Sequence, residues 1–171
     1  NQDGAETPAY VYSHYFLGRR ATALARIDLL NKLSQNFDVT VYTHADCKDI
    51  LPTAIYGGKI DYYDTMPTVF QHSKINLNIT LKTIQTGIPL RAWDILGCSG
   101  FLLTNFQQEL CDFFIPGEDF VYYESPPDAI EKAAYFLSHD RERQEIAHNA
   151  FEKIAASHTF HHRVQSMFDI I

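Results

Sequence analysis

Two charged side chains near the middle of the chain are spaced to act on one ligand. Arg91 and Asp94 stand three residues apart in residues 90–98, a segment whose apolar pattern predicts a short helix. Side chains three residues apart share one face of a helix. A carboxylate accepts hydrogen bonds from the vicinal hydroxyls of a ribose, and a guanidinium binds a phosphate through paired donors. The alternative is a local ion pair, which contributes little in solvent.

A second group of positive side chains precedes a helix predicted over residues 21–34. Gly18 allows the backbone to approach a ligand closely, and Arg19 and Arg20 begin the helix, where backbone N–H groups attract anions. Adjacent residues point about 100° apart on a helix, so at most one of these arginines aims at a phosphate. Lys82 offers a third positive charge from another loop. The alternative is a solvated helix start, and the chain has no GxGxxG pattern.

Aromatic and titratable residues elsewhere give weaker signals. Tyr62 and Tyr63, at the end of a strand predicted over residues 59–63, are candidates for stacking on a nucleotide base. No Ser-His-Asp or Cys-His arrangement follows from spacing, so the sequence identifies no catalytic residue. The C-terminal stretch SHTFHHR has no adjacent Asp, Glu or Cys to complete a metal shell, so we expect no metal site.

The elements that must position these residues alternate between strands and helices. We predict strands over residues 9–13, 38–43, 59–63, 74–80, 101–104 and 120–123. Helices are predicted over residues 21–34, 64–72, 90–98 and 107–114, and the last third is all helical from its start at Ser125 and Pro126. This order indicates an α/β fold, a Rossmann-like doubly wound parallel sheet with helices on both faces. In the strand order 3-2-1-4-5-6, the loops after Ser13 and Asn78 would face one crevice.

Composition limits the classes of protein and partner. The chain has 171 residues, of which 46% are hydrophobic, enough for one core. Its net charge of -7 argues against nucleic acid, and no apolar run reaches the roughly 20 residues that span a membrane. Three cysteines without paired spacing indicate reduced thiols and a cytoplasmic location. We expect residues 1–8 to form a linker or frayed N-terminus, residues 9–171 to form the domain, and the chain to be part of a longer polypeptide.

Three segments of the sequence carry a family resemblance. In chain order they are SKINLNIT, then RAWDILGCSGFLLTN, then FFIPGEDFVYYESPPDAIEKAAYFLSHDRERQEIAHNAFEKIAASHTFHHR. Together they resemble the C-terminal domain of CgeB-like (spore-maturation protein type) glycosyltransferases. These are GT-B enzymes of the family 1/family 4 kind. The resemblance covers about residues 10–168 and is strongest over 74–163. It implies a donor-binding half with a Rossmann-like fold and a helical C-terminus, which pairs with an N-terminal acceptor-binding half.

The resemblance also implies an activity and a set of binding residues. Such enzymes transfer a sugar from a nucleoside diphosphate sugar to an acceptor, here unknown, without a bound metal or cofactor. Gly18 with Arg19 or Arg20 matches the loop near the diphosphate, and Asn78 matches the Asn at the strand end. Arg91 matches the arginine of the R-x-x-E element of the family.

Two positions depart from the pattern of the family. Asp94 stands where the family usually has a glutamate that holds the donor ribose, and aspartate is one methylene shorter. Thr86 falls where related enzymes carry an earlier acidic residue. A sugar-nucleotide sensor or scaffold without catalysis therefore remains an alternative. The catalytic base of the enzyme, or its acceptor-orienting groups, would come from the N-terminal half, so we expect the isolated domain to be inactive.

Overall fold

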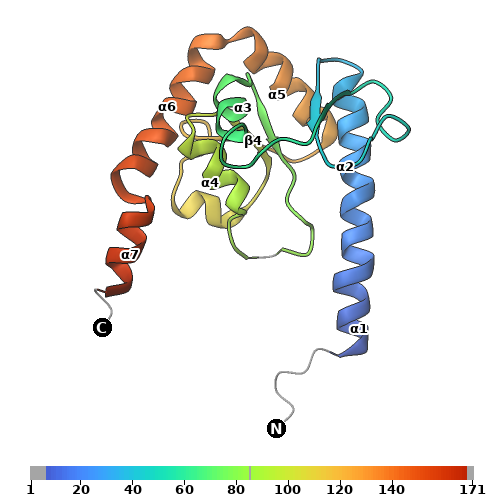
Figure 1. The fold of residues 1–171 in the computed structure, drawn as a ribbon, viewed down its shortest axis with the longest axis horizontal. Helices are drawn as coiled ribbons and strands as arrows, with labels where there is room; N and C mark the ends of the chain where they lie inside the picture. The colour runs from blue at the N-terminus through green and yellow to red at the C-terminus, as the bar shows by residue number, and fades with distance from the viewer. Residues whose placement is uncertain (1–6, 85, 169–171) are drawn as a thin grey trace. The chain divides into compact units, whose positions relative to one another are not determined.

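The computed structural model describes residues 7–84 and 86–168 (Figure 1). The chain falls into two compact units. Unit 1 comprises Asn1–Lys59 and Ile79–Gly87, and unit 2 comprises Ile60–Asn78 and Ile88–Ile171. All paired strands in both units are parallel, and helices separate most of them along the chain. The predicted α/β class with parallel sheets is confirmed.

Unit 1 begins with a helix where the sequence pattern predicts a strand. Residues 9–13 lie in α1 (Pro8–Val11) and η1 (Tyr12–Gly18, a π-helix), which run directly into α2 (Arg19–Ser34). The strand prediction is wrong because it relied on the β-forming residues of AYVYS and overlooked a helix start. The Thr7 side chain accepts a hydrogen bond from the Tyr10 N–H at 3.1 Å, and Pro8 occupies the first turn. The predicted linker over residues 1–8 lies mainly outside the described residues.

The rest of unit 1 packs against the C-terminal part of α2. Leu29 and Leu33 of α2 are buried, as is Leu51 in the segment between the strands. Two hydrogen bonds hold that segment against α2. The Ser34 and Thr53 hydroxyls bond to each other, and the Asn31 side chain donates to the Ile50 carbonyl. The strands β1 (Thr40–Tyr42) and β2 (Ile55–Gly58) pair in parallel.

The strand predicted over residues 59–63 is misplaced. The observed strand, β2, ends at Gly58, and residues 59–63 form an irregular segment and a turn. Gly57 lies within β2, where the Tyr42 ring crosses the backbone closely. A Cβ at Gly57 would lie 2.6 Å from that ring, so the position requires a glycine. Of the pair Gly57 and Gly58, Gly58, with a φ of 74°, has the left-handed backbone of a turn glycine.

Unit 2 contains a three-stranded parallel sheet in the order β3-β4-β5. Its strands are β3 (Asn76–Asn78), β4 (Leu102–Asn105) and β5 (Val121–Tyr123), all inside predicted segments or within one residue of them. The connections carry α4 (Leu90–Gly97) and the short 3-10 helix η2 (Gln108–Asp112), and α3 (Met66–His72) precedes β3. This is the βα alternation that a parallel sheet requires.

The core of unit 2 joins α4 to the sheet. Ala92, Ile95 and Leu96 of α4 are at most 1% exposed, as is Leu102 of β4. Phe70, Leu110, Phe114, Phe120 and Ala150 complete one contiguous hydrophobic cluster. α4 therefore contacts α3 and α6 as well as β3 and β4, so its position is fixed on several sides.

The C-terminal helices are α5 (Pro126–Ser138), α6 (Asp140–Ser157) and α7 (Phe160–Phe168). Ser125 caps α5, as predicted, and accepts a hydrogen bond from the Asp128 N–H, while His139 occupies the N-cap of α6. One face of α5 is buried. Its buried residues are Ala129, Ala133 and Phe136.

Two buried charges in unit 2 are neutralised by specific partners. Asp119 is 1% exposed and accepts hydrogen bonds from the Ile115 N–H and from the Lys153 ammonium group. Arg143 is 6% exposed and donates to the Phe136 carbonyl and to Asp140, both at 2.6 Å. Because an unpaired buried charge is costly, both pairs serve the fold.

At the junction of α6 and α7, His158 is a packing residue. His158 lies against the rings of Trp93, Phe113 and Phe114, and its Nδ1 accepts from the Arg163 guanidinium at 2.8 Å. Burial, followed by the positive charge of Arg163, lowers the pKa of His158. Over residues 7–84 and 86–168, no group of three or more potential ligands could hold a metal, and no helix is long and apolar enough to cross a membrane.

The two glycines at the end of α4 provide a test of this packing. A Cβ at Gly100 would lie 2.8 Å from Asn76 Nδ2, 2.9 Å from the Phe70 carbonyl and 3.0 Å from the Ile95 carbonyl. We expect Gly100→Ala to lower the free energy of unfolding by about 1–3 kcal/mol, since backbone atoms cannot move aside. Gly97→Ala is the control, because its nearest new neighbour would be 3.9 Å away. Equal urea-denaturation midpoints for the two variants would contradict the packing described.

Candidate functional site

The predicted binding residues are distributed over both units. Unit 1 carries Gly18, Arg19, Arg20 and Lys82, and unit 2 carries Tyr62, Tyr63, Asn78, Arg91 and Asp94. The prediction that both groups converge on one ligand stays a prediction. Within each unit, however, the structure shows which of these side chains lie together.

In unit 2, α4 presents Arg91 and Asp94 without pairing them. Gly87, with a φ of 101°, and Pro89 turn the chain into the helix, and no side chain caps its N-terminus. Arg91 is exposed and Asp94 is half-buried. Among the described residues no ion pair joins the two, and the Arg91 guanidinium instead lies 5.6 Å from the centre of the Phe70 ring. The local ion pair considered as the alternative is not formed.

Asp94 instead accepts a hydrogen bond from a residue that is distant in sequence. The Tyr62 hydroxyl donates to Asp94 Oδ2 at 2.6 Å, across a separation of 32 residues. This bond, followed by burial and the negative charge of Asp94, raises the pKa of the Tyr62 hydroxyl above its ordinary value. The Tyr62 side chain is still 38% exposed, so the pair is accessible from solvent.

A tight turn before α3 holds Tyr62 in place. Asp61 Oδ1 accepts from the backbone N–H groups of Tyr63 and Asp64, each at 2.8 Å, and the Asp61 carbonyl accepts from Met66 N–H at 2.9 Å. Such side-chain-to-backbone bonds are typical of an Asx turn. The turn therefore fixes the backbone on both sides of the aromatic residues.

Tyr63 lies beside Tyr62 in an edge-to-face arrangement, with 5.1 Å between the ring centres. Tyr63 is 83% exposed, so its ring is open to a ligand. Base stacking by either tyrosine stays a prediction.

Asn78 is buried in the sheet of unit 2. It is 7% exposed at the end of β3, and its Nδ2 donates to Thr104 Oγ1 of the neighbouring β4 at 3.0 Å. Asn76, two residues earlier, is also 7% exposed and donates to the Phe70 carbonyl at 2.9 Å. The two asparagines, which make β3 less apolar than an ordinary buried strand, thus bond to neighbouring elements inside the unit. A contact from Asn78 to the donor stays a prediction.

In unit 1, one face of the N-terminal helix binds the loop after β3. Gly18 lies so close to Thr83 that a Cβ there would be 2.0 Å from Thr83 Cγ2. Thr22 Oγ1 accepts from the Lys82 N–H at 3.0 Å, and Arg26 donates to the Ile79 carbonyl at 3.0 Å. Sequence reasoning missed Thr22 and Arg26. Gly18, Thr22 and Arg26 follow one another at intervals of four residues, which indicates a common face of the helix.

The structure corrects one argument for phosphate binding at Gly18. Gly18 has a helical φ of -63°, and the Arg19 N–H donates to the Phe16 carbonyl, so no helix begins there. The free N–H groups expected of a helix N-terminus are therefore absent at this point in the described chain. The Arg19 guanidinium lies 5.7 Å from the centre of the Tyr15 ring, while Arg20 is exposed. The exposed Lys82 side chain is positioned through its backbone, next to Thr22.

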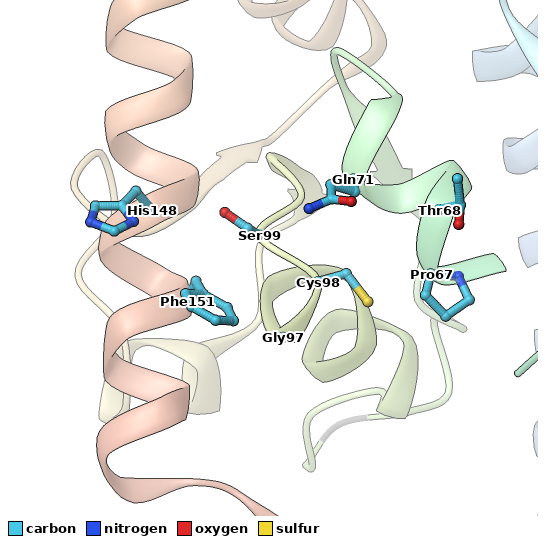
Figure 2. A pocket seen from close by; sticks show the side chains of 8 residues that line it. All are labelled: Pro67, Thr68, Gln71, Gly97, Cys98, Ser99, His148 and Phe151. Carbon is cyan, nitrogen blue, oxygen red and sulfur yellow. The ribbon is translucent and has the colours of Figure 1, made fainter. Parts of the chain in front are cut away.

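Unit 2 also has a separate open cavity of about 480 Å³ (Figure 2). Figure 2 shows the Ser99 and Gln71 side chains extending into the space between the helices, with the Cys98 sulfur turned toward Pro67. Burial, followed by the charge of Asp94, raises the pKa of the Cys98 thiol. The cavity lining consists of Pro67, Thr68, Gln71, Gly97, Cys98, Ser99, His148 and Phe151. It contains no lysine or arginine, so it does not provide the cations that a diphosphate needs.

Comparison with known proteins now places the chain in a family. The family model described as glycosyl transferase-like matches residues 19–169. The chain belongs to this glycosyl transferase-like family. A search of the curated proteins finds no match.

A solved structure supports the same fold. The chain is similar to the C-terminal domain of a glycosyl transferase group 1 family protein (LpcC) from Francisella tularensis, with a TM-score of 0.62 and 13% sequence identity. The similarity covers 84% of this chain and 82% of that chain. The predicted fold, that of the C-terminal half of a GT-B glycosyltransferase, is confirmed.

The docking of the loop in unit 1 leads to a prediction about amide exchange. Thr22→Val removes the hydroxyl that accepts from the Lys82 N–H, so we expect this amide to exchange with solvent about two- to tenfold faster. Thr22→Ser keeps the hydroxyl and is the matched control. Hydrogen exchange measured by NMR decides the point, and wild-type exchange at Lys82 in the valine variant would contradict it.

Proposed function

We propose that this chain is the donor-binding domain of a CgeB-like glycosyltransferase and that Asp94 and Arg91 of α4 bind a nucleoside diphosphate sugar. The observation that carries the proposal is the state of the Asp94 carboxylate. It is half-buried, no described cation neutralises it, and one of its oxygens accepts from Tyr62. In a glycosyl transferase-like chain, such a carboxylate on the helix that follows β3 suits the two hydroxyls of a ribose.

The positive groups would bind the diphosphate. Arg91, one turn before Asp94, is exposed, and its guanidinium lies 5.6 Å from the centre of the Phe70 ring. As the bond between sugar and diphosphate breaks, negative charge grows on the leaving phosphate, and fixed donors lower the energy of that state. Arg91, with Lys82 and Arg19 or Arg20 from unit 1, would supply these donors in place of a divalent metal ion. No cofactor is required by this mechanism.

The catalytic base and the acceptor site would lie in an N-terminal half of the same polypeptide. The sugar is of the hexose type in this proposal, and the domain alone is inactive because the acceptor half is needed for transfer. We also propose a cytoplasmic location, supported by three cysteines that are free in the described structure.

The second candidate is a sugar-nucleotide sensor or scaffold that has lost catalysis. Asp94 is shorter than the glutamate of related enzymes, and the exposed Thr86 brings no acidic group. Release of sugar from a donor by the intact polypeptide, with and without acceptors, separates the two functions. Binding without sugar release under any condition would favour the sensor.

Nucleotide affinity tests the proposed binding residues. A thermal-shift panel of UDP, GDP, dTDP, ADP and CMP identifies the nucleotide, and calorimetry then measures its affinity for variants of the chain. We expect Arg91→Ala and Asp94→Ala each to weaken binding about tenfold or more, because a charged hydrogen bond contributes about 1.5–3 kcal/mol and 1.4 kcal/mol is one decade.

Matched controls keep the charge changes comparable. Arg141→Ala removes an exposed arginine from α6, and Asp28→Ala removes an exposed carboxylate from α2. Both should bind like wild type. Wild-type affinity in the Arg91 and Asp94 variants as well would remove these two residues from the site.

A further inference from the structure

The contact between Tyr62 and Asp94 joins two elements of unit 2 at an accessible surface. Tyr62 comes from the turn before α3, and Asp94 comes from the middle of α4. The hydrogen bond between them is short, at 2.6 Å, and uses Oδ2 of the carboxylate. Neither residue belongs to the hydrophobic cluster of the unit, so packing alone does not explain the contact.

We propose that Tyr62 is a positioning residue for Asp94 and thereby makes the site prefer ribonucleotides over 2′-deoxyribonucleotides. This inference rests on the proposed function and adds a determinant of ligand class to it. Tyr62 acts through the carboxylate and needs no contact of its own with the ribose.

The acceptor capacity of the carboxylate supports this role. An ionised carboxylate offers about four lone-pair directions on its two oxygens. Tyr62 occupies one direction on Oδ2, so Oδ1 and the rest of Oδ2 are left for the paired hydroxyls of a ribose. A ribose offers two adjacent donors there, whereas a 2′-deoxyribose offers one.

Phe70 and Tyr62 keep the side chains of Arg91 and Asp94 apart. Arg91 and Asp94 are three residues apart on one helix, a spacing at which opposite charges attract each other. The Phe70 ring holds the Arg91 guanidinium at 5.6 Å from its centre, and the Tyr62 hydroxyl holds Asp94. Without Tyr62, Asp94 gains rotamer freedom and can turn toward Arg91, so part of the binding free energy is spent on reordering it.

Tyr62 is suited to hold another side chain because it is itself held. The Asx turn of Asp61 fixes the backbone on either side of it, and a tyrosine has only two side-chain torsions to immobilise. The hydroxyl is thus presented at low entropic cost.

The first experiment measures discrimination at the ribose. Calorimetry compares UDP with dUDP, GDP with dGDP and ADP with dADP, on wild type and on Tyr62→Phe. Tyr62→Phe should weaken binding of the ribonucleotide about two- to tenfold and leave the 2′-deoxynucleotide within about twofold, so the ratio between them falls. A merely structural role would weaken both nucleotides alike.

Tyr135→Phe is the matched control. The Tyr135 hydroxyl also donates to an exposed carboxylate, that of Glu142 at 2.9 Å, and joins α5 to α6. This variant should keep the wild-type ratio. An unchanged ratio in Tyr62→Phe, or tighter ribonucleotide binding, overturns the role of Tyr62 while the proposed function stands. No binding of any nucleotide by wild type overturns both.

The second experiment needs no ligand. The ultraviolet absorbance of tyrosinate, taken as the difference between wild type and Tyr62→Phe over a pH titration, reports the ionisation of Tyr62. Because Asp94 raises the pKa of this hydroxyl, the difference curve should move to lower pH in an Asp94→Asn background. An identical curve in both backgrounds would show that the contact is absent in solution, which also overturns the proposal.

Discussion

The burial of one face of α4 determines where the charged residues of the candidate site can be. Ala92, Ile95 and Leu96 are almost completely excluded from solvent against the sheet and neighbouring helices. Burying a Leu or Ile side chain contributes about 1.5–3 kcal/mol each, so rotating the helix would forfeit several kcal/mol. With that face fixed, the 3.6-residue repeat places Arg91 and Asp94 where solvent and ligands can reach them. The hydrophobic core thus orients the polar groups.

Local charge must outweigh the overall charge if this chain binds a diphosphate. The net charge is -7, which opposes an anion at long range. At physiological ionic strength, however, interactions between exposed charges are largely screened beyond about 8 Å. Arg91, which forms no ion pair among the described residues, therefore contributes more to the potential next to Asp94 than distant charges do. Tyr62 is a neutral donor, so it holds Asp94 without cancelling the charge of the carboxylate.

Patterns within single segments were predictable from the sequence, and contacts between distant segments were not. The cap at Ser125 and the apolar run of β4 each dictate local structure, and both were predicted correctly. The strand predicted over residues 9–13 failed because β propensity was weighed above the Thr7-Pro8 helix start. In α2 the polar residue Thr22 is buried, because its hydroxyl bonds to a loop 60 residues away. No periodicity could pair Tyr62 with Asp94, since that contact depends on how α3 and α4 pack.

A crystal structure of this chain with the nucleoside diphosphate that stabilises it most would test the central claim directly. We predict that the two ribose hydroxyls lie within hydrogen-bonding distance of the Asp94 carboxylate, about 2.6–3.2 Å, with Tyr62 still bonded to Oδ2 and a phosphate oxygen at Arg91. A nucleotide bound elsewhere, with Asp94 contacting only Tyr62, would contradict the account.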